Sequence, residues 1–246
     1  MAGEYLWLHK MGRYRLNLDA IEESLRYVQK NFAQINQTLN TRRDIMRDEI
    51  VANMMSGYAF VDDALGAYPA TDMMEFKHSQ YLLELNFIVL CGENQDIRWE
   101  HRSHIEATTE RFYNQEGCNI RQILTWYRKH KKDSPWKRTA GVYIQLLSQP
   151  QLFIEGNHRT GALIMSYLLA RDGNAPFVLS TRNAKAYFDP STLIKDTTKN
   201  WATQLVKLPK INKRFASFLE KTCKKKGRYV EEMDKRVEYS RLSGVN

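Results

Sequence analysis

The sequence predicts an all-α protein, on three observations. Apolar residues recur every three or four positions along most of the chain, which is the spacing of one helix face. The stretch Ala162-Leu-Ile-Met-Ser-Tyr-Leu-Leu-Ala170 is apolar on nearly all sides, which is typical of a helix buried at the centre of a domain. A short polar loop, residues 151–161, joins it to another apolar helix before it. We therefore expect a helical bundle that holds this loop between two buried central helices.

In the first half of the chain we expect an irregular or short-strand lead over residues 1–17, followed by four helices. Asn17 or Asp19 can cap the first helix, because both side chains accept hydrogen bonds from helix-start amides. The apolar face of this helix, over 19–40, packs inside the protein or pairs with a second copy. The other three helices are expected over 44–65, 71–91 (with Thr71-Asp72 as its cap) and 97–112.

The central helix is expected to begin near Arg159–Thr160. It should stop at Gly173-Asn174, because these residue types adopt the left-handed conformation that ends helices. The helix that delivers the polar loop is expected over 137–149, and Pro150 stops it.

The remaining segments complete an all-helical second half. Residues 177–179 are expected to be extended. A helix should start at Asp189-Pro190, with the proline in a first-turn position that tolerates it. Further helices are expected over 120–131, 199–207, 212–225 and 229–241.

The length of 246 residues and the hydrophobic content of 43% suffice for a buried core. We expect an N-terminal helical lead (1–44), a core domain (45–200) and a basic C-terminal helical extension (201–246). Three widely spaced cysteines favour a reducing compartment and no metal cage. No apolar run reaches the length of a membrane span, and the first residues do not resemble a secretory signal. We therefore expect a cytoplasmic protein, or one delivered into a host cytosol.

The net charge of +9 favours acidic partners, such as nucleotides, nucleic acid, an anionic membrane or an acidic protein. Much of it lies in two basic runs, 128–138 and 221–228, which are interpreted first as solvated helix faces. No nucleic-acid-binding motif accompanies them. A basic helical nucleic-acid binder is kept as a third function, behind the two described below.

The polar loop Gln151-Leu-Phe-Ile-Glu-Gly-Asn-His-Arg-Thr-Gly161 contains the candidate site. Gly156 can take a positive φ, and Asn157 and Thr160 are capping types. The first amides of a helix lack internal partners and carry the positive end of its dipole, so they bind phosphate. Arg159 adds a planar donor fork suited to phosphate. The simpler alternative is a glycine turn that caps a core helix and leaves the arginine solvated.

This loop resembles the signature of the Fic/Doc (Fido) family, His-x-Phe-x-Asp/Glu-Gly-Asn-Gly-Arg-x-x-Arg. These α-helical enzymes usually move AMP from ATP onto a protein hydroxyl. The resemblance covers roughly residues 45–200 and is specific over 151–163. It implies that Phe153 is a core anchor and that 156–159 form the anion hole, next to which we count Thr160 as a further phosphate-binding candidate. It also implies that Glu155 binds Mg²⁺ and Arg159 contacts the phosphates of ATP or another nucleotide.

The resemblance further implies a short β-hairpin flap within residues 104–119, which would align a target protein segment. Three positions depart from the family pattern: the catalytic histidine is Gln151, the second glycine is His158 and the final arginine is Ala162. The run 157–163 is closest to the Doc branch, which phosphorylates proteins but keeps the histidine. The inhibitory motif Ser/Thr-x-x-x-Glu-Gly/Asn has no match in this sequence.

Two function classes therefore stay open. In the first, the chain transfers a nucleotidyl or phosphoryl group onto a protein hydroxyl by altered chemistry. Gln151 cannot accept a proton, and His158 is the nearest titratable group, although a protonated imidazole there would instead bind phosphate. In the second, the chain is an inactive pseudoenzyme that binds nucleotide or protein as a scaffold.

Overall fold

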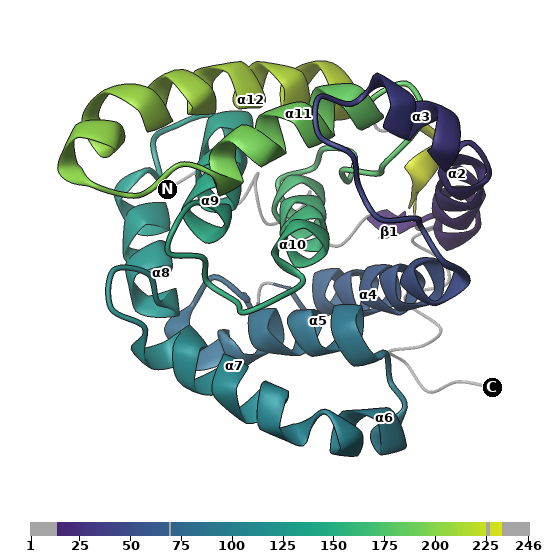
Figure 1. Ribbon diagram of the computed structural model, residues 1–246, viewed down its shortest axis with the longest axis horizontal. Helices are drawn as coiled ribbons and strands as arrows, with labels where there is room; N and C mark the ends of the chain where they lie inside the picture. The colour runs from purple at the N-terminus through teal and green to yellow at the C-terminus, as the bar shows by residue number, and fades with distance from the viewer. Residues whose placement is uncertain (1–13, 69, 225–226, 233–246) are drawn as a thin grey trace, which may run out of the picture.

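The computed structural model describes residues 14–68, 70–224 and 227–232, and these form a mostly helical domain (Figure 1). The predicted all-α class is thus confirmed, apart from a two-stranded sheet. The α-helices are α2 (Leu18–Lys30), α3 (Phe32–Thr38), α4 (Asp48–Ala67), α5 (Gln80–Cys91), α6 (Gln95–Glu100), α7 (Arg102–Asn114), α8 (Ile120–Lys129), α9 (Pro135–Leu147), α10 (Asn157–Arg171), α11 (Ala184–Lys195) and α12 (Leu208–Cys223). The shorter elements are β1 (Tyr14–Leu16), β2 (Val230–Glu232), 3₁₀ turns at Phe76–His78 and Gly227–Tyr229, and a π-helical turn at Thr203–Lys207.

Helix α10 lies at the centre of the molecule (Figure 1). Twelve of its fifteen residues are buried, so it presents no solvent face of any size. It packs against α9, α4 and α5, while α12 packs across α9. The prediction of a fully buried central helix is confirmed.

Glycines at two helix–helix contacts let α9 and α4 pack closely against α10. A Cβ on Gly161 would come within 2.6 Å of the Tyr143 ring of α9. A Cβ on Gly57 of α4 would come within 2.4 Å of the Leu163 side chain. Glycine at a helix–helix contact costs helix propensity but brings two backbones together.

The sheet pairs the two ends of the described chain. β1 runs antiparallel to β2, with Leu16 opposite Val230, and Tyr229 accepts a hydrogen bond from the Asn17 amide. The helix predicted over 229–241 is therefore wrong at 230–232, because these residues extend to pair with β1. The remainder of that helix, and most of the predicted lead over 1–17, lie outside the described residues.

Several predicted helix limits need correction. The helix predicted over 19–40 is two helices, because it breaks at Asn31, and Asn17 caps the first through its side chain. Asp72 does not cap a helix. It pairs with Arg171, and α5 begins only at Gln80. Pro190 lies inside α11 and not in its first turn.

The predicted β-hairpin flap within 104–119 is wrong. Most of that segment is α7, and a turn at Gly117 links it to α8. Phe112 of α7 is fully buried and stacks on Phe153, with ring centroids 5.7 Å apart. Its helical, core-facing role explains why the segment does not form a hairpin.

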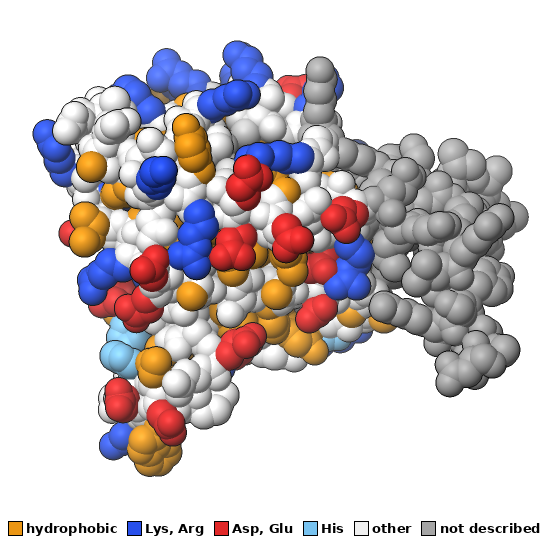
Figure 2. All heavy atoms as spheres, turned by 90° about the vertical axis from the view of Figure 1, so that its right-hand side faces the viewer, with side chains coloured by type: hydrophobic (Ala, Val, Ile, Leu, Met, Phe, Trp, Pro, Cys, Tyr) orange, Lys and Arg blue, Asp and Glu red, His pale blue; other side chains and the backbone are white. Residues whose placement is uncertain are grey.

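The surface charge is uneven. Figure 2 shows Lys and Arg side chains along the upper edge of the molecule, where Figure 1 places α12, and a band of acidic side chains below them. The exposed basic residues of α12 include Lys210, Lys213, Arg214 and Lys221. No helix within the described ranges is long and apolar enough to cross a membrane.

The end of α10 is fixed by a buried charge. The Arg171 side chain is 4% exposed, and its Nη1 lies 2.8 Å from Asp72 Oδ1. Its guanidinium also donates to the Tyr127 hydroxyl and lies against the rings of Tyr68 and Tyr167. One side chain thus joins α10, α8 and the segment before α5.

We predict that Arg171→Met lowers the free energy of unfolding by about 3–5 kcal/mol, because it leaves the Asp72 carboxylate without its buried partner. Methionine keeps most of the volume, so lost packing contributes little. Arg228→Met is the control: its ion pair with Glu23 is exposed, and the expected loss is about 0–1 kcal/mol. Urea unfolding followed by circular dichroism measures both. Equal losses in the two variants would contradict the assigned role of Arg171.

Candidate functional site

The polar loop turns into α10 at Gly156. This glycine has φ +73°, in the left-handed region, and is the N-cap of the helix. A Cβ at this position would come within 2.9 Å of Asn86 Nδ2 on α5. Backbone conformation and space therefore both require glycine. The helix begins at Asn157, two residues earlier than predicted.

Asn157 closes the loop on itself. Its Nδ2 donates to the Phe153 carbonyl at 2.8 Å, and its Oδ1 accepts from the Phe153 amide at 3.0 Å. Asparagine provides the donor and acceptor that this pair of groups needs. Since Phe153 is fully buried, Asn157 fixes the loop to the core instead of capping the helix.

Two further residues, which the sequence did not indicate as part of the site, hold the loop in place. Asn86, buried on α5, donates to the Glu155 carbonyl and to Thr160 Oγ1, both at 3.0 Å. The Lys199 ammonium donates to the carbonyls of Gln145, Ser148 and Pro150 at the end of α9. Asn86 lies in the helix predicted over 71–91, whereas nothing in the local sequence pointed to Lys199.

The start of α10 offers backbone donors. Gly156 makes no side-chain cap, and the first helical hydrogen bond is from the Thr160 amide to the Gly156 carbonyl at 2.9 Å. The amides of residues 157–159 precede that bond, and they carry the positive end of the helix dipole.

Arg159 and Glu155 lie beside these amides. Arg159 is half-buried, and its Nη1 donates to the Val89 carbonyl at 2.9 Å. Burial lowers the pKa of its guanidinium, while the nearby charges of Glu155 and Glu49 raise it. Glu155 is exposed and could contribute one carboxylate to a cation. The described residues contain no group of three or more His, Cys, Asp or Glu that could hold a metal.

The Gln151 side chain is hydrogen-bonded to neighbouring groups of the protein. Its Nε2 donates to the Leu147 carbonyl at 3.1 Å, and its Oε1 accepts from Asn157 Nδ2 at 3.5 Å. Its own carbonyl accepts from Arg111 Nε at 3.0 Å. The side chain has no titratable group, so it holds the loop start and cannot take up a proton.

His158 lies on the other side of α10, in a polar network. Its Nε2 is 3.4 Å from Arg43 Nη1, and its Nδ1 is 3.2 Å from the Tyr143 hydroxyl. Arginine only donates, so Nε2 accepts and the proton lies on Nδ1. Burial, with the charges of Arg43 and Lys195, lowers the pKa of His158 to about 3. The imidazole is therefore neutral near pH 7, so a protonated His158 that binds phosphate is disfavoured.

A cavity of about 260 Å³ adjoins this side of α10. His158, Arg159 and Ala162 contribute its α10 wall, and Arg43 lines it from the segment between α3 and α4. Ala162 stands where the family signature has its final arginine, and its short side chain leaves space there. Arg43 was not predicted, because it lies between two expected helices and outside any motif.

Comparison of the chain with protein-family models, with curated proteins and with solved structures found no match.

The low pKa of His158 predicts a specific pH dependence. In the unfolded chain the imidazole takes up a proton near its ordinary value of 6.5, whereas the folded protein resists protonation until about pH 3. The stability that wild-type protein has above pH 6.5 is therefore lost as the pH falls, by up to about 1.4 kcal/mol per pH unit. In His158→Gln this loss should be absent.

The measurement is urea unfolding of the wild type and His158→Gln between about pH 7 and about pH 5. The difference in unfolding free energy between the two should move in favour of the variant as the pH falls. Exposed His101→Gln serves as the control. A difference that stays constant with pH would show that His158 is not held neutral.

Proposed function

We propose that residues 151–162 bind the phosphates of a nucleotide. The observation that carries this proposal is the start of α10: a left-handed Gly156 without a side-chain cap, followed by the amides of residues 157–159 and by Arg159. Backbone donors, a helix dipole and a guanidinium in one place favour a phosphate group. The resemblance to the Fic/Doc signature implies that this nucleotide is ATP or a related compound.

The protein offers one carboxylate near this site that can bind Mg²⁺. Glu155 is exposed beside Arg159 and offers one hard oxygen ligand. Mg²⁺ commonly uses one or two carboxylates and takes its other ligands from phosphates and water. Glu155 would therefore hold the ion only together with the nucleotide, where the ion neutralises phosphate charge.

Binding without efficient transfer is the form of this function that the geometry supports best. Transfer to a hydroxyl gains about 10²–10⁴-fold from a general base. Gln151 cannot act as a base and is hydrogen-bonded to Leu147 and Asn157. His158, with a pKa of about 3, is a weak base that faces Arg43 and Tyr143. We therefore place a nucleotide-binding pseudoenzyme ahead of a transferase with altered chemistry.

The binding proposal is tested by calorimetry with ATP and Mg²⁺. We expect the wild type to bind and Arg159→Ala to weaken binding by about 1.5–3 kcal/mol, the range for a hydrogen bond to a charged group. Arg182→Ala, which removes an exposed arginine from the segment before α11, should leave the affinity unchanged. If the wild type binds no nucleotide at low or moderate salt, the proposal fails.

The same titration shows whether Glu155 is a ligand of Mg²⁺ or only a charge at the start of the helix. If Glu155 holds Mg²⁺, Glu155→Gln weakens binding in the presence of Mg²⁺ and has no effect with a chelator. A helix-terminal charge alone contributes only about 0.3–1 kcal/mol to stability and gives no metal dependence. A loss of affinity that is the same with and without chelator would remove Glu155 from the metal site.

We also predict that the natural protein shows little transfer of AMP and that Gln151→His raises it. The histidine would supply the missing proton acceptor, which contributes about 10²–10⁴-fold in enzymes that use one. Radiolabelled ATP and a lysate, or the protein itself as acceptor, report transfer, with Gln149→His as the control for a new histidine nearby. Equal labelling by wild type and Gln151→His would contradict the assignment of position 151.

A further inference from the structure

The cavity beside α10 is apolar over most of its surface. Its wall includes Leu25 of α2, Phe32 of α3, Met54 of α4, Phe177 from the segment after α10 and Phe188 of α11. In Figure 1 the segment that joins α3 to α4 runs between α3 above and α4 below, and this segment contributes Arg43, Asp44 and Met46 to the lining. The cavity is therefore bounded by packed helices and by one connecting segment.

Two arginine side chains contribute to the wall of this cavity. Arg43 and Arg159 both line it, and within the described residues neither forms an ion pair. The Arg43 Nη2 donates to Thr192 Oγ1 at 2.7 Å and to the Phe188 carbonyl at 3.2 Å, whereas its Nε is buried and has no hydrogen-bond partner. A buried donor without an acceptor costs free energy, and more so on a charged group.

His158 does not remove this excess charge, because its imidazole is neutral and only accepts a hydrogen bond from Arg43. Asp44 is the only acidic residue that lines the cavity in the described part of the chain, and it is exposed. Arg159 has the charges of Glu155 and Glu49 nearby, whereas Asp189, the carboxylate that feels the charge of Arg43, is already paired with Lys185. The Arg43 guanidinium therefore offers one positive charge to a ligand, which favours a single negative charge over several.

The cavity is partly open to solvent, so its volume sets the scale of the part of a ligand that it encloses. An apolar cavity of about 150 Å³ holds benzene, which has six heavy atoms. By the same ratio, a cavity of about 260 Å³ holds about ten heavy atoms. Aliphatic and aromatic side chains on the wall, including two flexible methionines, Met46 and Met54, suit an apolar body of adaptable shape.

We propose that this cavity binds a small amphiphilic monocarboxylate, with its carboxylate at Arg43 and its apolar body among Phe32, Met54 and Phe188. The carboxylate accepts from Arg43 Nη1, whose hydrogen bond to His158 is long at 3.4 Å, and the apolar body removes apolar surface from water. The site is distinct from the backbone amides proposed to bind nucleotide phosphates, although Arg159 borders both.

Octanoate, which matches the estimated size, is the probe. Binding is measured by calorimetry and by NMR of methionine methyl groups, with the Met46 and Met54 signals assigned by substitution. We expect octanoate to bind and to shift these two signals. Arg43→Gln should weaken octanoate binding at least about tenfold, the loss expected when a hydrogen bond to a charged group is removed.

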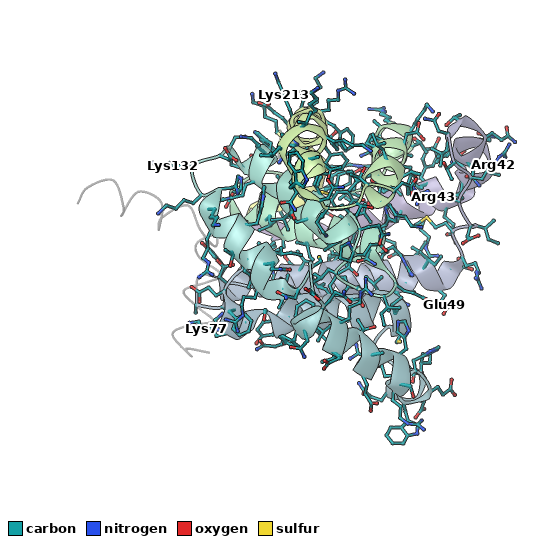
Figure 3. All side chains as sticks on the ribbon, turned by 60° about the vertical axis from the view of Figure 1, so that its left-hand side comes forward. Arg42, Arg43, Glu49, Lys77, Lys132 and Lys213 are labelled. Atoms are coloured by element: carbon teal, nitrogen blue, oxygen red, sulfur yellow. The ribbon has the colours of Figure 1, made fainter. Side chains whose placement is uncertain are left out.

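The chain offers a matched control for that variant. Figure 3 shows Arg42 at the outer edge of the molecule and Arg43 nearer its body. Arg42 is exposed and does not line the cavity, so Arg42→Gln should change octanoate affinity by less than about twofold. Ala162→Leu, which fills the cavity from α10, should also abolish binding, and circular dichroism checks that each variant is folded.

Three outcomes would overturn the proposal: no binding of octanoate at millimolar concentration, equal losses in Arg42→Gln and Arg43→Gln, or equal binding of 1-octanol and octanoate. The last would show an apolar cavity that does not select an anion. Glu155→Gln should leave octanoate binding unchanged, so this site and the nucleotide site can fail independently.

Discussion

The pair of hydrogen bonds between the Asn157 side chain and the backbone of Phe153 is the constraint on which the loop depends. It fixes a four-residue turn between a buried aromatic ring and the first residue of α10. The left-handed Gly156 then follows from geometry, because the chain must reverse within that turn. Asn86 and Lys199 hold the turn from outside, at the Glu155 carbonyl and the end of α9. A rigid turn of this kind keeps the helix-start amides in one orientation.

The central helix imposes a second constraint. A helix that is buried on all sides must satisfy its polar groups inside the protein. Ser166 does so by donating to the Ala162 and Phe177 carbonyls, and Thr160 by accepting from Asn86. At the far end, Arg171 needs a carboxylate and aromatic faces around it. These polar contacts select one packing of α10 among many that would bury the same apolar area.

The sequence was sufficient for the parts of the structure that local patterns determine. The apolar spacing of 19–40 predicts a helical face, and the run 162–170 predicts the buried central helix. Contacts between distant segments override other local signals. Asp72 looks like a helix cap but pairs with Arg171, and residues 230–232 look helical but extend against β1. In the candidate site, the left-handed Gly156 follows from its residue type. Asn157 was expected as a helix cap but binds the Phe153 backbone, and Arg43 reaches His158 only through the tertiary fold.

The pairing of β1 with β2 has a consequence for the order in which the protein folds. Because Leu16 and Val230 are far apart along the chain, their contact has a large sequence separation and closes a long loop. During synthesis, β1 has no partner until β2 has also been made. Helices α4, α5, α9 and α10 form their contacts within a shorter stretch of chain and can be in place by then. The strand pair would then close onto a helical core that is already assembled, and one slow, long-range step would follow many fast, local ones.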